Sequence, residues 1–106
     1  MKLWIDDVRP APKEYVWIRS VNEAIRHITI YSNYIDFDNN LVDCIELIDI
    51  DHDAGDYARY GGGYIKLLDW LEETGRNYPI RIHSKNPVGI ANMRAIIQKN
   101  NWKEVF

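Results

Sequence analysis

The chain has 106 residues, which is enough for one domain over residues 1–106 but not for two, and 46% of them are hydrophobic, as in an ordinary globular fold. Its net charge of −3 and the absence of any run of Lys and Arg argue against general binding to duplex nucleic acid, which requires a basic face. One short apolar run precedes the first acids and there is a single cysteine, so we expect a cytoplasmic protein without signal peptide, membrane contact or intrachain disulfide.

The first third of the chain predicts two strands and a helix. Leu3 to Ile5 is a short bulky run with an abrupt acidic end, as in a buried strand, and Tyr15 to Ile18 is rich in β-branched and aromatic residues. The prolines at positions 10 and 12 exclude a helix between these strands. Ser20, with Glu23 three residues later, predicts the start of a helix whose apolar residues share one face.

The middle of the chain predicts a loop, a strand and a second helix. Residues 32–43 are polar and rich in Asn and Asp, as in a loop, whereas residues 44–50 form an apolar run that predicts the third strand. Residues 54–63 are predicted to form the most open stretch of the chain, and they end in three glycines. These glycines lack the Gly-Lys-Ser/Thr ending of a phosphate-binding loop, which favours a flexible hinge. An amphipathic helix follows from Tyr64 and is expected to end near Gly75.

The last third predicts a fourth strand at Ile80 to His83, a helix and a final edge strand over residues 102–106. Asn86 followed by Pro87 is typical of a helix start. Strands and helices therefore alternate along most of the chain. This alternation predicts an α/β fold with a mostly parallel five-stranded sheet covered on both faces.

Acidic residues follow two of the predicted strands, at the sheet edge where open α/β folds place their ligands. Asp6 and Asp7 end the first strand, while Asp51 and Asp53, which share one side of an extended segment, follow the third. Magnesium prefers one or two carboxylates with waters and phosphate oxygens, so these four acids are candidate ligands for Mg²⁺ or Mn²⁺. The alternative is that they belong to solvated turns, the first pair forming salt bridges with Arg9.

Two histidines lie beside these acids in the predicted layout. His83 ends the fourth strand, where an imidazole suits proton transfer or metal ligation. His52 is the second candidate for acid–base catalysis, and Asp53 could act as an acceptor as well as a ligand. The candidate phosphate-binding residues are Arg9, Ser84, Lys85 and Asn86.

Three segments of the chain resemble the cyclic-phosphate processing receiver domains, a divergent branch of the receiver fold. They are Leu-Trp-Ile-Asp-Asp-Val-Arg-Pro-Ala-Pro at residues 3–12, Asp-His-Asp-Ala-Gly at residues 51–55 and Ile-His-Ser-Lys-Asn-Pro at residues 82–87. This resemblance spans nearly the whole chain and implies a receiver-like three-layer α/β/α sandwich in which a Pro-containing loop replaces the first receiver helix. It also implies a role in handling cyclic phosphates.

The resemblance assigns roles to particular positions. Asp6 and Asp7 resemble the acidic pair that binds metal in receivers. Asp51 or Asp53 resembles the third-strand acid that accepts phosphate in ordinary receivers, and Ser84 resembles the hydroxyl residue after the fourth strand.

These observations favour a metal-assisted phosphoesterase that acts on a small cyclic nucleotide or on an RNA end with a 2′,3′-cyclic phosphate. The alternative is a non-catalytic receiver-like switch that binds a divalent metal and a phosphate or nucleotide. A plain interaction domain with solvated polar turns is a third possibility. The sequence leaves open whether the domain is an enzyme, which cyclic phosphate it takes and what its oligomeric state is.

Overall fold

The computed structural model describes residues 1–106 and is built around a sheet of five parallel strands. The strands are β1 (Lys2–Ile5), β2 (Tyr15–Ile18), β5 (Leu47–Ile50), β6 (Ile80–Ile82) and β7 (Glu104–Val105). Their order across the sheet is β2-β1-β5-β6-β7, with β5 at the centre. This sheet confirms the receiver-like α/β prediction, and the Pro-containing stretch between β1 and β2 stands in place of a helix.

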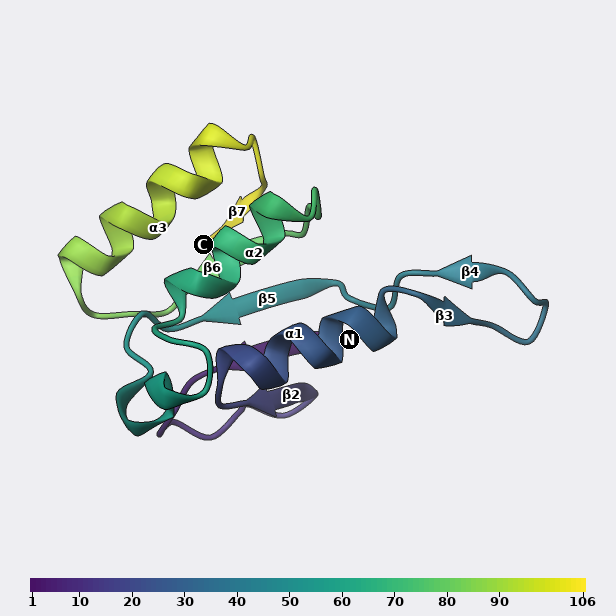
Figure 1. The fold of residues 1–106 in the computed structure, drawn as a ribbon, viewed down its shortest axis with the longest axis horizontal. Coiled ribbons are helices and arrows are strands. Elements are labelled where there is room, and N and C mark those ends of the chain that lie inside the picture. The colour runs from purple at the N-terminus through teal and green to yellow at the C-terminus, as the bar shows by residue number, and fades with distance from the viewer.

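The helices of the sheet connections are α1 (Val21–Tyr31), α2 (Ile65–Glu73) and α3 (Pro87–Lys99). Local sequence sets their ends as predicted. The Ser20 hydroxyl oxygen accepts a hydrogen bond in the first turn of α1, and the Asn86 side chain does the same for α3. Beyond α2, Gly75 takes a φ of +68°, a conformation that glycine adopts at little cost. Figure 1 shows α1, α2 and α3 following one another across the sheet.

One hydrophobic core lies between the three helices and one face of the sheet. Alternate strand residues face this core, among them the fully buried Leu3, Ile5, Ile48 and Ile50. The helical connections all advance across the sheet in the same direction, from β2 toward β7. Because such connections are right-handed, all three helices lie on the same face.

The opposite face of the sheet carries no helix. Trp4, Asp49 and Arg81 lie side by side on this face, across β1, β5 and β6. The loop between β1 and β2 crosses over it, since Nε1 of Trp4 donates to the backbone carbonyl of Arg9 at 2.9 Å. This face therefore lacks the second helical layer of the predicted α/β/α sandwich, and the loop and large side chains such as Trp4 cover part of it.

Three stretches differ from the prediction. Residues 32–43, predicted as a loop, contain an antiparallel hairpin of β3 (Tyr34–Ile35) and β4 (Leu41–Val42). The predicted strand over residues 44–50 is wrong at its start, because the N–H of Cys44 donates to the Tyr31 carbonyl at the end of α1. A short 3₁₀ helix, η1 (Gly55–Arg59), lies in the stretch predicted to be open. None of the helices has the length and apolar character needed to cross a membrane.

Candidate metal centre and its neighbours

The carboxyl ends of β1, β5 and β6 bring together two acids and a histidine. Asp6, Asp51 and His83 each offer one ligand atom, and these three atoms lie within 4.8 Å of one another. Asp6 is fully buried and His83 is 5% exposed, while Asp51 is half-buried. A cluster of this composition could bind a metal ion, as receiver domains do.

Strand register explains why these three side chains meet. Trp4, Asp49 and Arg81 stand opposite one another on the helix-free face. Side chains of a strand alternate between faces, so the residues two positions further along each strand emerge on that same face. Those residues are Asp6, Asp51 and His83.

The imidazole of His83 is held on three sides. Its Nδ1 lies 2.7 Å from Oδ1 of Asp49, and its Nε2 lies 3.0 Å from Oδ2 of Asp6. The ring stacks on Trp4 with a centroid separation of 3.8 Å and an interplanar angle of 3°. Both ring nitrogens of His83 therefore have a carboxylate as their neighbour.

Asp49 is the buried acid behind His83. Its carboxylate also binds the Arg81 guanidinium at 3.1 Å and the Tyr15 hydroxyl at 3.3 Å. Burial and the neighbouring Asp49 raise the pKa of Tyr15, so this phenol stays protonated and can donate. Three donors therefore compensate the cost of burying one carboxylate.

Asp6 is ionised at neutral pH although it is buried. Burial acts to raise its pKa, but hydrogen bonds from the backbone N–H groups of Arg9 and Val8 and from His83 outweigh burial, and the pKa is lowered. Both backbone groups donate to Oδ1, at 2.8 and 3.0 Å. The other oxygen, Oδ2, faces His83 and Arg9 and is the candidate ligand atom of this carboxylate.

The guanidinium of Arg9 lies among the same three residues. Its Nε is 3.3 Å from Oδ2 of Asp6, its Nη2 is 3.7 Å from Oδ2 of Asp51, and Nη2 also donates to the His83 backbone carbonyl at 3.3 Å. The side chain is 45% exposed on a loop. The positively charged guanidinium of Arg9 therefore occupies the space between the candidate metal ligands.

The donor set fits a divalent cation. A histidine that ligates through one nitrogen usually donates its other N–H to a carboxylate, which fixes the ring orientation. Here Nε2 of His83 faces the two acids, and Nδ1 has Asp49 as its partner. Binding a cation at these atoms would replace the contact between Nε2 of His83 and Asp6, and it would require the guanidinium of Arg9 to move aside.

The chain matches the model of one protein family, described as the cyclic-phosphate processing receiver domain, over residues 1–99. The chain belongs to this family. Its match extends across the acids after β1 and β5 and the histidine after β6, and it confirms the resemblance identified from the sequence motifs. No curated protein and no solved structure matches the chain.

In this receiver domain, two of the predicted metal ligands lie outside the three-residue cluster. Asp53 is exposed, and its Oδ1 accepts the Gly55 N–H at 2.9 Å. The Asp7 carboxylate packs on the Gly55 backbone. If Gly55 carried a β-carbon, that carbon would lie 2.4 Å from Oδ2 of Asp7. Burial, followed by the charges of Asp6, Asp51 and Asp53, raises the pKa of Asp7. Both acids thus add negative charge around the cluster.

His52 lies close to the start of α3. Gly89 makes room for its ring, since a β-carbon at that position would lie 2.3 Å from Cγ of His52. Nδ1 is buried without a hydrogen-bond partner, whereas Nε2 is not enclosed. Of the two histidines beside the acids, His52 is thus the one with a free ring nitrogen.

The receiver domain uses the remaining predicted phosphate-binding residues in different ways. Ser84 accepts the backbone N–H of Asn86 at 3.0 Å, and the Asn86 side chain accepts the N–H groups of Val88 and Gly89. Those amides are therefore already capped. Lys85 is exposed and makes no ion pair.

Sequence reasoning did not assign a role to Asp49 or Arg81, which hold His83 from behind. The available signal was the two-residue period, because Asp49 and Asp51, like Arg81 and His83, alternate with isoleucines that face the core. The partner of Asp49 depends on strand order, because Arg81 stands opposite it on the neighbouring strand.

Proposed function

We propose that this domain is a metal-assisted phosphoesterase that opens cyclic phosphates, either cyclic nucleotides or RNA ends with a 2′,3′-cyclic phosphate. The observation that carries the proposal is the cluster of Asp6, Asp51 and His83, in which Asp49 holds the imidazole through Nδ1, the nitrogen that does not face the other two ligand atoms. Family membership supports the substrate class. The expected metal is Mg²⁺ or Mn²⁺, and the imidazole favours Mn²⁺, because Mg²⁺ takes oxygen ligands.

In this proposal, different residues bind the cation, orient His83 and hold the phosphate. When bound, the cation supplies a Lewis acid that stabilises charge on a phosphate oxygen. Asp6, Asp51 and His83 hold it, and Asp49 orients His83. Arg9, displaced from the cluster, remains on an exposed loop at the same edge and can hold a phosphate oxygen through paired hydrogen bonds.

Hydrolysis also requires a proton to move. Water adds to phosphorus and gives up a proton, one ester P–O bond breaks, and the released alkoxide oxygen takes up a proton. We assign this transfer to His52 in preference to His83, because both nitrogens of His83 contact carboxylates while Nε2 of His52 is open. Asp53 is exposed next to His52 and remains a candidate acceptor.

The test is incubation of the purified domain with a panel of cyclic phosphates, with Mg²⁺, with Mn²⁺ and with chelator, followed by mass analysis of the products. We expect ring opening of one substrate class that needs metal and is lost in Asp51→Asn. Asp56→Asn is the matched control, because Asp56 is an exposed acid of the same segment outside the cluster. Loss of turnover in the control, or turnover that survives chelation, would contradict the proposal.

One observation favours a non-catalytic binding module as the second candidate. Arg9 and Arg81 already offset part of the negative charge of Asp6, Asp49 and Asp51 within the domain. A module of this kind would bind metal with phosphate or nucleotide and leave cyclic phosphates intact. An increase in melting temperature with Mn²⁺ and nucleotide, without any product, would favour this function over hydrolysis.

A further inference from the structure

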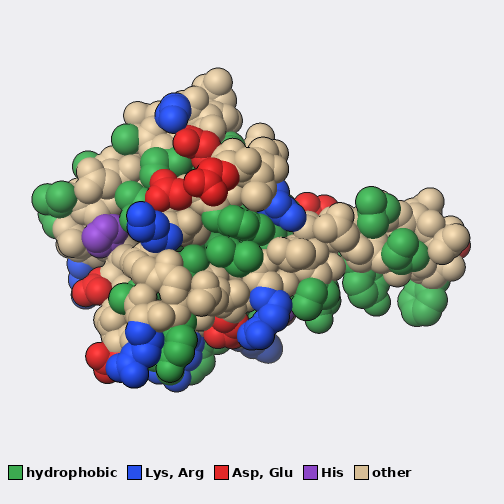
Figure 2. Space-filling view, in the orientation of Figure 1, with side chains coloured by type: hydrophobic (Ala, Val, Ile, Leu, Met, Phe, Trp, Pro, Cys, Tyr) green, Lys and Arg blue, Asp and Glu red, His purple; other side chains and the backbone are tan.

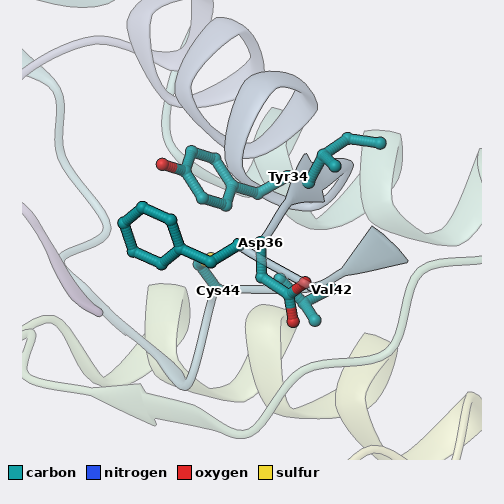
Figure 3. Close-up of a pocket in the computed structure, with 6 residues that line it drawn as sticks. Tyr34, Asp36, Val42 and Cys44 are labelled. Carbon is teal, nitrogen blue, oxygen red and sulfur yellow. The ribbon is translucent and has the colours of Figure 1, made fainter. Parts of the chain in front are cut away.

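The only cavity of the structure lies on the hairpin of β3 and β4, apart from the candidate metal centre. Figure 2 shows hydrophobic side chains along this projecting hairpin. The cavity has a volume of about 330 Å³, and Figure 3 shows Tyr34, Val42 and Cys44 around it, with Asp36 beside them. None of the residues that line it belongs to the metal centre. The acids of the metal centre are therefore positioned by direct contacts with their neighbours and not by a cavity wall.

The backbone carbonyls of Asp6 and Asp7 are held by two side chains from the end of β2. Nε1 of Trp17 donates to the Asp6 carbonyl at 2.8 Å. Nε and Nη2 of Arg19 both donate to the Asp7 carbonyl, at 3.0 and 2.6 Å. One strand end thus binds two successive carbonyls of the acidic turn that follows β1.

The peptide group between Asp7 and Val8 connects Arg19 to Asp6. Its carbonyl accepts the Arg19 guanidinium, and its N–H donates to Oδ1 of Asp6 at 3.0 Å. A trans peptide group is planar, so its C=O and its N–H point in opposite directions. Fixing the carbonyl therefore also aims the N–H at Oδ1 of Asp6. The second oxygen, Oδ2, is then left facing His83 as the candidate metal ligand.

The guanidinium of Arg19 is itself fixed in place. Its Cζ lies 4.6 Å from the ring centroid of Trp17 and 4.7 Å from that of Tyr57 in η1, and aromatic rings attract a cation at such distances. The Arg19 carbonyl accepts the hydroxyl of the fully buried Tyr64 at 2.7 Å. The guanidinium donates to a neutral carbonyl and not to a carboxylate. Its contribution is therefore the direction of the Asp7 peptide group.

We propose that Arg19 is a positioning residue of the metal centre, which holds the turn after β1 so that Asp6 presents Oδ2 to the cation. This inference rests on the proposed function, because it concerns the same cation. The role of Arg19 is opposite to that of Arg9. Arg9 lies among the ligands and competes with the cation, whereas Arg19 holds the backbone behind Asp6 and supports binding.

The charge of Arg19 and its hydrogen bonds predict effects of opposite sign. Removing a positive charge beside the acidic turn should by itself strengthen the binding of a cation, as expected for Arg9. Removing the hydrogen bonds to the Asp7 carbonyl should weaken it, because Asp6 loses its fixed orientation. Residues that hold metal ligands in place typically contribute about 10–100-fold to metal affinity. Arg19→Gln removes the charge and the paired donors together, so the sign of the change identifies which of them matters.

Isothermal titration calorimetry of the full chain with Mn²⁺ tests the proposal. We expect the Kd of Arg19→Gln to rise at least about tenfold. Arg19→Lys keeps the charge but lacks the planar fork that donates two N–H groups, so its Kd should rise as well. Circular dichroism checks that each variant folds, and Arg19→Lys provides the test if Arg19→Gln does not fold.

Arg76→Gln is the matched control. The Arg76 guanidinium also lies over an aromatic ring, with Cζ 4.5 Å from the ring centroid of Trp70. Arg76 follows α2 and precedes β6, which places it at the edge of the sheet opposite the metal centre. The control therefore loses the same charge and the same kind of contact, and its Kd for Mn²⁺ should change less than about twofold.

Hydrogen exchange of the Val8 amide, followed by NMR, tests the positioning without any metal. In the wild type this amide donates to Oδ1 of Asp6. In Arg19→Gln and Arg19→Lys the peptide group is no longer held through its carbonyl, so the amide should exchange at least about fivefold faster. In Arg76→Gln its exchange should be unchanged.

Three results would overturn the proposal. The first is an Mn²⁺ Kd of Arg19→Gln equal to or below that of the wild type. The second is a lower stability of both Arg19 variants in urea with unchanged Kd, because Arg19 would then serve the fold alone. The third is unchanged exchange of the Val8 amide in both variants. A wild-type chain that binds no Mn²⁺ would refute the proposed metal centre and the metal role of Arg19 with it, whereas faster Val8 exchange in the variants would still show that Arg19 holds this turn.

Discussion

Replacing Arg9 by Gln should strengthen the binding of a divalent metal. The guanidinium lies between Asp6 and Asp51 and donates to the backbone of His83, so it contacts each of the three candidate ligands. A cation entering this space must displace it. Gln keeps much of the side-chain length and removes the positive charge that competes for the two carboxylates.

The expected gain follows from the two ion pairs that hold Arg9 in place. Exposed pairs contribute about 0.2–1 kcal/mol each, and here the arginine is 45% exposed while Asp6 is fully buried. Together the two pairs hold the guanidinium by about 0.4–2 kcal/mol, and the burial of Asp6 favours the upper half of this range. Because 1.4 kcal/mol corresponds to a factor of ten, the metal Kd of Arg9→Gln should fall about tenfold.

Isothermal titration calorimetry with Mn²⁺ measures this change directly. Lys13→Gln is the matched control, because Lys13 is exposed on the same loop and its loss changes the net charge equally. In that control we expect a change in Kd of less than about twofold. An Arg9→Gln variant that binds Mn²⁺ no better than wild type would refute competition for the space. No binding by either chain would instead refute the proposed metal centre.

The buried residues around the cluster make three further variants informative. Asp49→Asn should lower the free energy of unfolding in urea by about 2–3 kcal/mol, because the Arg81 guanidinium loses its buried partner; a loss under about 0.5 kcal/mol would argue against this. Asp7→Asn should be more stable than wild type at neutral pH, because burial and nearby acids raise the pKa of Asp7 and its ionised form opposes folding. That gain should disappear as the pH falls below about 4, where the carboxyl is protonated in both states, and a gain that persists there would contradict the stated cause. Gly89→Ala should shift the NMR signals of the His52 ring, since the added carbon would lie 2.3 Å from Cγ; unchanged signals would show that the ring does not depend on this glycine.

Local chemistry made several elements predictable from the sequence. The caps at Ser20 and Asn86 involve partners at most three residues away, so the residue types alone indicate where α1 and α3 begin. The prolines after β1 exclude a helix in the same way. The hairpin was missed because its two strands have only two residues each, too few for an alternating pattern to stand out from a polar loop.

The cluster itself was only partly predictable. Asp6, Asp51 and His83 were expected at one sheet edge, because the carboxyl ends of parallel strands meet there. Which nitrogen of His83 meets which acid depends on contacts such as the one to Asp6, 77 residues away. The same holds for Asp49, whose role behind His83 depends on β5 and β6 being neighbours. Strand order is a property of the whole chain and is absent from any short motif.

The loop that replaces a helix after β1 is also what assembles this site. Its backbone at Arg9 donates to Asp6 and accepts from the indole of Trp4, so one residue fixes both an acid and the aromatic ring on which His83 stacks. In a helix starting at this place, most backbone groups would bond to one another and not to these side chains. The free sheet face also leaves room for Arg81 beside Asp49. The Pro-containing loop between β1 and β2 therefore accounts both for the missing helix and for the buried position of His83.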